Sequence, residues 1–254
     1  MLKLFDDNWL KVTLCLLAIL IILMLNNFYY LQKSLLPLVE KMFPNGLFQV
    51  HNLEKENIVI LTIDDGLSSR SNELLDLLDK FDAKATFFIH KFNTKKIDNY
   101  QEILMKMLAQ GHEIGNHTPE DIHSIKLSAQ EFDQQFREAD EFLRNLNIKP
   151  LFFRAAGGLF NVKKMMPLLR EFNYKDQFIM ASFLPWDTFL PFPKTYANQL
   201  AKGIFSGAIV VFHDGEQKGE KRLKRTFISL TKFLQEMKRK NYQVVSLGEA
   251  INKN

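Results

Sequence analysis

Two adjacent carboxylates, Asp64 and Asp65, stand at the end of an apolar run and are followed by Gly66. The run at 57–63 is short, β-branched and almost free of polar residues, which is typical of a buried strand. Neighbouring strand residues face opposite sides, but glycine lets the backbone turn sharply, so both carboxylates could reach one cleft. Like charges this close need a cation or a hydrogen-bond donor to separate their roles. The pair therefore predicts a metal ligand beside a general base, the alternative being an inert solvated turn.

Other residues able to do chemistry also follow apolar segments, namely His117, Arg154, His213 and Asp214. In a parallel barrel the carboxyl ends of all strands open on one face, and that face holds the active site. We therefore expect these scattered side chains to converge with the two aspartates.

Short apolar segments alternate with longer amphipathic ones from residue 57 onward. Strands are predicted at 57–63, 84–89, 112–115, 151–153, 177–181, 207–212 and 242–246. Helices are predicted near 71–81, 99–110, 128–146, 162–173, 194–205 and 221–240. Strict alternation favours parallel strands covered by helices. About seven such units predict an α/β fold, a distorted or incomplete (β/α) barrel.

The N-terminal stretch at 12–25 is apolar apart from Thr13 and has no charge. Trp9 and the Tyr29-Tyr30 pair bracket it, as interfacial aromatics bracket a membrane span, and ~20 helical residues cover ~30 Å. The uncharged run alone is short enough for a signal-peptide core, but no small-residue cleavage pattern follows. We predict a membrane anchor at 1–31, a juxtamembrane connector at 32–56 and a catalytic domain at 57–254. Flanking lysines are nearly balanced, so charge does not set the orientation.

Composition narrows the possible partners. The chain has 254 residues, of which 46% are hydrophobic, enough for a sizeable core, and its net charge is +4. The basic residues cluster late, on a predicted amphipathic helix, which favours a solvated face over a nucleic-acid partner. Cys15 is the only cysteine, so no intrachain disulfide is expected.

Four segments together resemble the polysaccharide deacetylase family, also called the NodB homology domain or carbohydrate esterase family four: 62–66, 111–118, 153–158 and 209–214. The resemblance spans roughly residues 55–252, with the motifs in family order. It implies a metal-dependent hydrolase that removes N-acetyl groups from a polymer of N-acetylated hexosamine, such as peptidoglycan, a chitin-like glycan or an exopolysaccharide. One divalent ion, zinc by expectation, would be the cofactor. The domain would then lie outside the cytoplasmic membrane, held by the single N-terminal span.

The same resemblance implies the residue roles. Asp65 and His117 would bind the metal, and Asp64 would be the base that deprotonates water. His213 would be the acid that protonates the leaving amine, and Arg154 would keep Asp64 ionised and oriented.

The third metal ligand departs from the family pattern, which has a second histidine four residues after the first. Here position four is Asp121, and a histidine comes only at His123. Asp121 keeps the register, whereas His123 completes an Asp-His-His set and is slightly favoured. Thr118-Pro119 predicts a helix start between them and His117. His90 ends the strand predicted at 84–89 and could line the cleft, but no motif supports it as a ligand.

The fourth family motif is represented only by Trp186-Asp187. Asp187 is expected to orient His213, and Trp186 with Val211 to form the pocket for the acetyl methyl group. Ala156 also stands where the family usually has proline. These irregularities leave a second hypothesis open, a catalytically impaired relative that binds glycan as a cell-envelope scaffold. A third, suggested by the barrel, is a hydrolase of small cyclic amides.

Overall fold

A parallel sheet organises the domain in the computed structural model, which describes residues 29–158, 161–183, 187, 192–215 and 219–253. Its neighbouring strands are, in order, β4 (Glu113–Asn116), β3 (Thr86–Ile89), β2 (Ile58–Asp64) and β6 (Ala208–His213). Strand β7 (Gln243–Val245) pairs with residues 58–60 of β2. The register sets Asp64 beside His213, so the carboxyl ends of β2 and β6 coincide.

Further short pairings carry the sheet round toward its other edge. Strands β1 (Gly46–Leu47) and β5 (Phe178–Ile179) pair in parallel, and Phe153 bridges β5 to β4. Beyond β5, the backbone N–H of Ser182 donates to the carbonyl of Ile209 in β6. The strands thus follow the predicted incomplete barrel, in which the strand expected at 151–153 is reduced to the Phe153 bridge, while β1 was not predicted.

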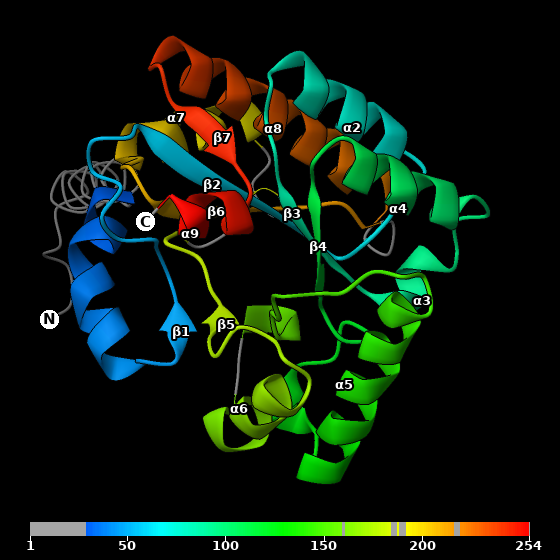
Figure 1. Ribbon diagram of the computed structural model, residues 1–254. Coiled ribbons are helices and arrows are strands. Elements are labelled where there is room, and N and C mark those ends of the chain that lie inside the picture. The colour runs from blue at the N-terminus through cyan, green and yellow to red at the C-terminus, as the bar shows by residue number, and fades with distance from the viewer. Residues whose placement is uncertain (1–28, 159–160, 184–186, 188–191, 216–218, 254) are drawn as a thin grey trace, which may run out of the picture.

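Six helices match predicted segments to within a few residues: α2 (Ser71–Lys80), α4 (Tyr100–Ala109), α5 (Ala129–Arg144), α6 (Val162–Glu171), α7 (Pro193–Gly203) and α8 (Glu220–Arg239). Local chemistry explains some starts: Ser128 and Glu131 form a capping box at α5, and Pro193 begins α7. Two short helices were not predicted, α3 (Lys91–Thr94) and α9 (Leu247–Asn252). In Figure 1, α2, α4, α7 and α8 lie on one side of the sheet, and α5 and α6 lie toward β5.

Strand β2 is buried along its whole length because both of its faces meet apolar layers. Val59, Leu61 and Ile63 join the cluster under α2, α4, α7 and α8. Ile58 and Ile60 point the other way, into a cluster with residues of β3, β6 and β7. This alternation explains the continuous apolar run that precedes the two aspartates.

The segment at 32–56, predicted as a juxtamembrane connector, instead belongs to the folded domain. Residues 29–42 form a helix, and Phe48, Val50 and Leu53 are buried. Tyr29, predicted to lie at a membrane interface, is 5% exposed and its ring packs 5.6 Å from that of Phe183. The apolar stretch at 12–25 lies outside the described residues. Within the described ranges, no helix has the length and apolarity needed to span a bilayer.

Candidate active site

The carboxyl ends of β2, β3, β4 and β6 bring together the polar side chains that the sequence scatters. A cleft of about 680 Å³ is lined on one side by Asp64, Asp65, His117, Arg154 and His213. The predicted convergence at one face of the sheet is therefore present for these five residues, whereas Asp214 accepts hydrogen bonds from the Ser68 and Ser71 hydroxyls and does not line the cleft.

The turn after β2 lets both aspartates face this cleft. Asp65 has a φ of 82° and Gly66 a φ of 101°, so two successive residues adopt left-handed backbone conformations. The turn ends the alternation of side chains between the two faces of the strand, as was predicted from the glycine at position 66. The side-chain amide of Asn93 donates to the Asp65 carbonyl at 3.0 Å and holds the turn against α3.

Arg154 is the fixed partner of Asp64. Its Nη1 donates to Asp64 Oδ1 at 2.5 Å and to Thr62 Oγ1 at 2.9 Å. The remaining guanidinium N–H groups donate to the carbonyls of Ile179 and Met180. Because the side chain is 4% exposed and bonded in four directions, it holds Asp64 Oδ1 in one orientation.

His213 pairs with Asp187 in the manner predicted. Its Nδ1 lies 2.9 Å from Asp187 Oδ1, and its backbone N–H donates to Asp187 Oδ2 at 3.1 Å. Thr226 also donates to Oδ2, at 3.0 Å. Burial disfavours the imidazolium, but the charge and hydrogen bond of Asp187, aided by Asp65 and Asp64, outweigh it and raise the pKa of His213 to about 9. The ring is therefore protonated at neutral pH.

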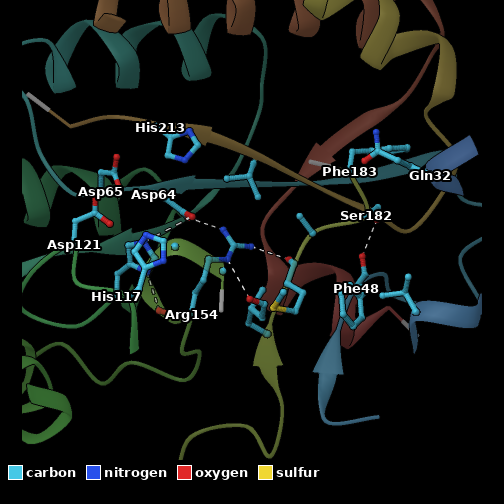
Figure 2. Close-up of a pocket in the computed structure, with 18 of the residues that line it drawn as sticks. Gln32, Phe48, Asp64, Asp65, His117, Asp121, Arg154, Ser182, Phe183 and His213 are labelled. Atoms are coloured by element: carbon cyan, nitrogen blue, oxygen red, sulfur yellow. Dashed lines mark hydrogen bonds and ion pairs between the residues drawn. The ribbon is translucent and has the colours of Figure 1, made fainter. Parts of the chain in front are cut away.

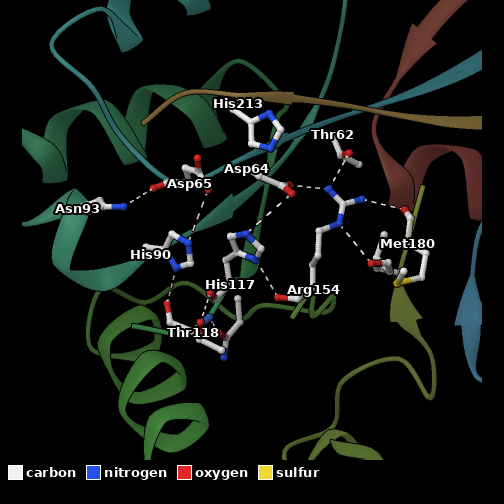
Figure 3. Close-up of polar contacts among 12 residues, drawn as sticks. Thr62, Asp64, Asp65, His90, Asn93, His117, Thr118, Arg154, Met180 and His213 are labelled. Atoms are coloured by element: carbon white, nitrogen blue, oxygen red, sulfur yellow. Dashed lines mark hydrogen bonds and ion pairs between the residues drawn. The ribbon is translucent and has the colours of Figure 1, made fainter. Parts of the chain in front are cut away.

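A buried cluster of Asp65, His90 and His117 lies beside these pairs (Figure 3), with one possible ligand atom from each within 4.8 Å of the others. The two imidazole rings stack with centroids 4.3 Å apart. His117 Nδ1 lies 2.8 Å from the Arg154 carbonyl, and His90 Nδ1 lies 3.2 Å from the Thr118 carbonyl. Burial, reinforced by the neighbouring His90, lowers the pKa of His117 to about 4, so its ring is neutral.

This donor set fits a divalent metal ion. Each Nδ1–H is directed at a carbonyl, which leaves each Nε2 lone pair for a metal. His90 Nε2 is buried and has no hydrogen-bond partner in the described parts of the chain, an arrangement that costs free energy unless a ligand satisfies it.

For the third ligand, the structure offers a candidate that the sequence did not single out. Asp121 and His123 both line the cleft, but neither joins a metal-binding group among the described residues, whereas His90 does. Thr118 has a φ of 68° and no helix begins at Pro119, so the predicted helix start is wrong. His90 was passed over for want of a motif, although its position at the end of a predicted strand was a usable signal.

The expected acetyl pocket is described in part. Val211 lines the cleft and is 4% exposed, while Trp186 lies outside the described residues. Two features of the cleft were not predicted: Arg222 of α8 faces it, and the helix at 29–42 forms an apolar wall at its far end through Leu35, Leu36 and Val39.

Comparison with known proteins agrees with this geometry. Residues 51–176 match the family described as polysaccharide deacetylase. A peptidoglycan-N-acetylglucosamine deacetylase of Bacillus cereus is 29% identical over 209 residues, which cover 82% of this chain and 94% of the relative. This chain belongs to the polysaccharide deacetylase family.

Other polysaccharide deacetylases are similar over most of the chain. A chitin deacetylase of Colletotrichum lindemuthianum is 27% identical over 226 residues, which cover 85% of this chain and 87% of the relative. The solved structure of a peptidoglycan N-acetylglucosamine deacetylase superposes with a TM-score of 0.69 at 23% identity, covering 82% of this chain and 93% of that one. A family pseudoenzyme from Bacillus anthracis gives the same TM-score at 22% identity, covering 82% and 69%. These structural likenesses establish the shared fold.

Proposed function

We propose that this polysaccharide deacetylase is an active, metal-dependent enzyme that removes N-acetyl groups from a polymer of N-acetylated hexosamine. The supporting observation is that the Asp64–Arg154 and His213–Asp187 pairs stand in one cleft beside a buried Asp-His-His cluster. Relatives named for peptidoglycan and chitin support that substrate class.

Asp65 and His117 would hold the divalent ion, for which zinc is the expected metal. When bound, such an ion lowers the pKa of water and polarises the acetyl carbonyl. The buried, neutral imidazole of His117 is suited to binding because its Nδ1–H donates to a carbonyl.

The chain's own groups divide the proton transfers. Asp64 keeps Oδ1 on Arg154, so Oδ2 is available to accept a proton from the attacking water. His213 is protonated and its Nδ1–H is committed to Asp187, so Nε2–H can donate to the leaving nitrogen as the C–N bond breaks. One water and one amide are thereby converted to acetate and a free amine.

Acetate release by the purified full chain tests this proposal, with N-acetylglucosamine oligomers and peptidoglycan as substrates and zinc added or chelated. We expect metal-dependent release in the wild type and a loss of at least ~100-fold in Asp64→Asn. Glycan binding without turnover on any substrate or metal would instead support the scaffold hypothesis.

We also propose that the apolar stretch at 12–25 anchors the protein in the cytoplasmic membrane with the catalytic domain outside. Its support is the uncharged run in the sequence. Alkaline extraction of membranes, followed by protease treatment of intact and lysed cells, tests it. Release of the protein from membranes by alkali would contradict an anchor. Resistance of the domain to protease in intact cells would contradict an external position.

A further inference from the structure

We propose that His90, from the end of β3, is the third protein ligand of the metal and replaces the second histidine of the family's second motif. The site is thus Asp65, His90 and His117, and its ligand is a divalent cation such as zinc. This inference refines the proposed function, since the ion is the one that deacetylation would use.

The first argument is the state of the His90 side chain. The residue is 0% exposed, and its Nε2 has no hydrogen-bond partner within the described ranges. That atom lies 3.7 Å from Asp65 Oδ1. Two ligand atoms ~2.1 Å from a tetrahedral zinc ion are about 3.4 Å apart, so the observed separation is close to that of a ligand pair.

The second argument is that His90 and His117 have the same hydrogen-bonding arrangement. Each directs Nδ1 at a backbone carbonyl, of Thr118 and Arg154 respectively, and each leaves Nε2 toward the aspartates. The rings stack 25° from parallel. His90 Nε2 lies 3.7 Å from Asp65 Oδ1, and His117 Nε2 lies 3.8 Å from Asp64 Oδ2. Outer hydrogen bonds of this kind orient histidine ligands and fix their tautomer.

The third argument is the rigid attachment of His90 to the Asp65 turn. Asn93 of α3 bonds the Asp65 carbonyl. A Cβ on Gly66 would lie only 3.2 Å from Thr94 Oγ1 and 3.4 Å from the backbone N and O of His90. Glycine therefore lets the Asp65 turn approach the end of β3 closely.

The fourth argument is that His123, the candidate slightly favoured from the sequence, packs against another loop. The chain leaves His117 through the left-handed Thr118, and the Pro119 carbonyl accepts a bond from the Phe92 N–H at 3.0 Å. The ring of His123 lies against Gly157, where a Cβ would come within 2.8–2.9 Å of three ring atoms. His123 thus packs on the loop that follows Arg154.

Cobalt spectroscopy on the full chain tests His90 directly. In His90→Cys, a thiolate bound to Co²⁺ should give a near-ultraviolet charge-transfer band. The wild type, which retains Cys15, and His123→Cys should show no such band. A band in His123→Cys, or none in cobalt-loaded His90→Cys, would overturn the assignment.

Metal affinity supplies a second, independent readout. His90→Gln replaces the imidazole with a neutral polar side chain, and circular dichroism checks its fold. We expect it to bind zinc at least ~100-fold more weakly than the wild type and to lose the zinc-induced rise in melting temperature. Asp121→Asn and His123→Gln should bind as the wild type does.

Wild-type affinity in His90→Gln, or no metal binding by the wild type, would refute the proposal. Zinc binding through His90 without any acetate release would leave this inference intact and refute the proposed function. Metal-dependent acetate release that is unchanged in His90→Gln would refute this inference and leave the proposed function intact.

Discussion

His213 Nδ1 and Asp187 Oδ1 are 2.9 Å apart, and Asp187 itself is 1% exposed. A buried carboxylate in this position stabilises the imidazolium and fixes which nitrogen faces the cleft. The pair therefore determines over which pH range His213 can act as an acid.

Asp187→Asn should move the alkaline limb of the activity profile to lower pH. An acid must be protonated to work, so wild-type activity should hold up to the His213 pKa of about 9 and fall above it. Without the Asp187 charge that pKa returns toward or below 6.5, so activity at pH 8 should drop by at least ~10-fold. The measurement is initial acetate release from pH 5 to 10.

Asp176→Asn is the matched control for that substitution, since Asp176 pairs with Arg170 on the surface. Its pH profile should coincide with that of the wild type. An unmoved alkaline limb in Asp187→Asn would show that His213 is not the titrating acid.

Arg154→Met should destabilise the protein strongly as well as reduce turnover. It leaves the Asp64 carboxylate buried without its partner, which typically costs about 3–5 kcal/mol. Arg137→Met removes exposed ion pairs with Asp133 and Glu171, which solvent screens, so it should destabilise the protein far less. Urea unfolding measures both.

A double variant isolates the charge effect at Arg154. Adding Asp64→Asn to Arg154→Met should cost less than the sum of the two single changes, because no unpaired charge remains. Strict additivity would argue that Arg154 acts through packing alone.

Gly157→Ala tests the position of His123. The substitution meets both a positive φ of 70° and the His123 ring, so we expect a loss of about 2–3 kcal/mol. Gly158→Ala isolates the backbone effect, since its φ is 66° and no neighbouring atom of the described residues lies within 4 Å of the added Cβ. It should cost only about 1 kcal/mol.

In a His123→Ala background the cost of Gly157→Ala should fall to that of Gly158→Ala. Thermal or urea unfolding of the wild type, of Gly157→Ala, Gly158→Ala and His123→Ala, and of the His123→Ala/Gly157→Ala double variant gives the answer. Equal costs of Gly157→Ala with and without the ring would place His123 elsewhere.

Tyr29→Ala and Tyr30→Ala form a matched pair that tests the N-terminal helix. Tyr29 is 5% exposed and packs on Phe183 and Tyr196, so its truncation should cost about 3 kcal/mol of unfolding free energy. Tyr30 is 48% exposed and should cost within about 0.5 kcal/mol. Similar small losses of unfolding free energy at both positions would mean that this helix does not pack on the domain and is a connector, as the sequence predicted.

Much of the fold was predictable because its strands and helices carry strong, different periodicities. Strand β2 and helix α8 fall within one residue of their predicted bounds. Strands of one or two paired residues, such as β1 and the Phe153 bridge, are too short for any pattern, and tertiary contacts alone define them. The connector prediction missed the packing of this segment because Pro37 and Pro44 interrupt its apolar residues, Leu36 and Phe48 among them.

The site was predictable where a residue follows a strong strand, as with Asp64, His117 and His213. It was not predictable where residues far apart in the sequence are neighbours in the fold. His90 and His117 are 27 positions apart, yet their rings stack because β3 and β4 are neighbours with Ile89 beside Asn116. Asp121 and His123 are nearer to His117 in sequence and line the same cleft, yet neither joins a metal-binding group among the described residues.

The most direct measurement of the central claim is acetate release as metal-free full chain is reloaded stepwise with zinc. The account predicts that the rate of release from N-acetylglucosamine oligomers rises in proportion to bound zinc and levels at one ion per chain. It also predicts that Asp64→Asn takes up the same ion yet releases at least ~100-fold less acetate. A metal-free protein that releases acetate at the full rate, or a zinc-loaded wild type that releases none, would contradict it.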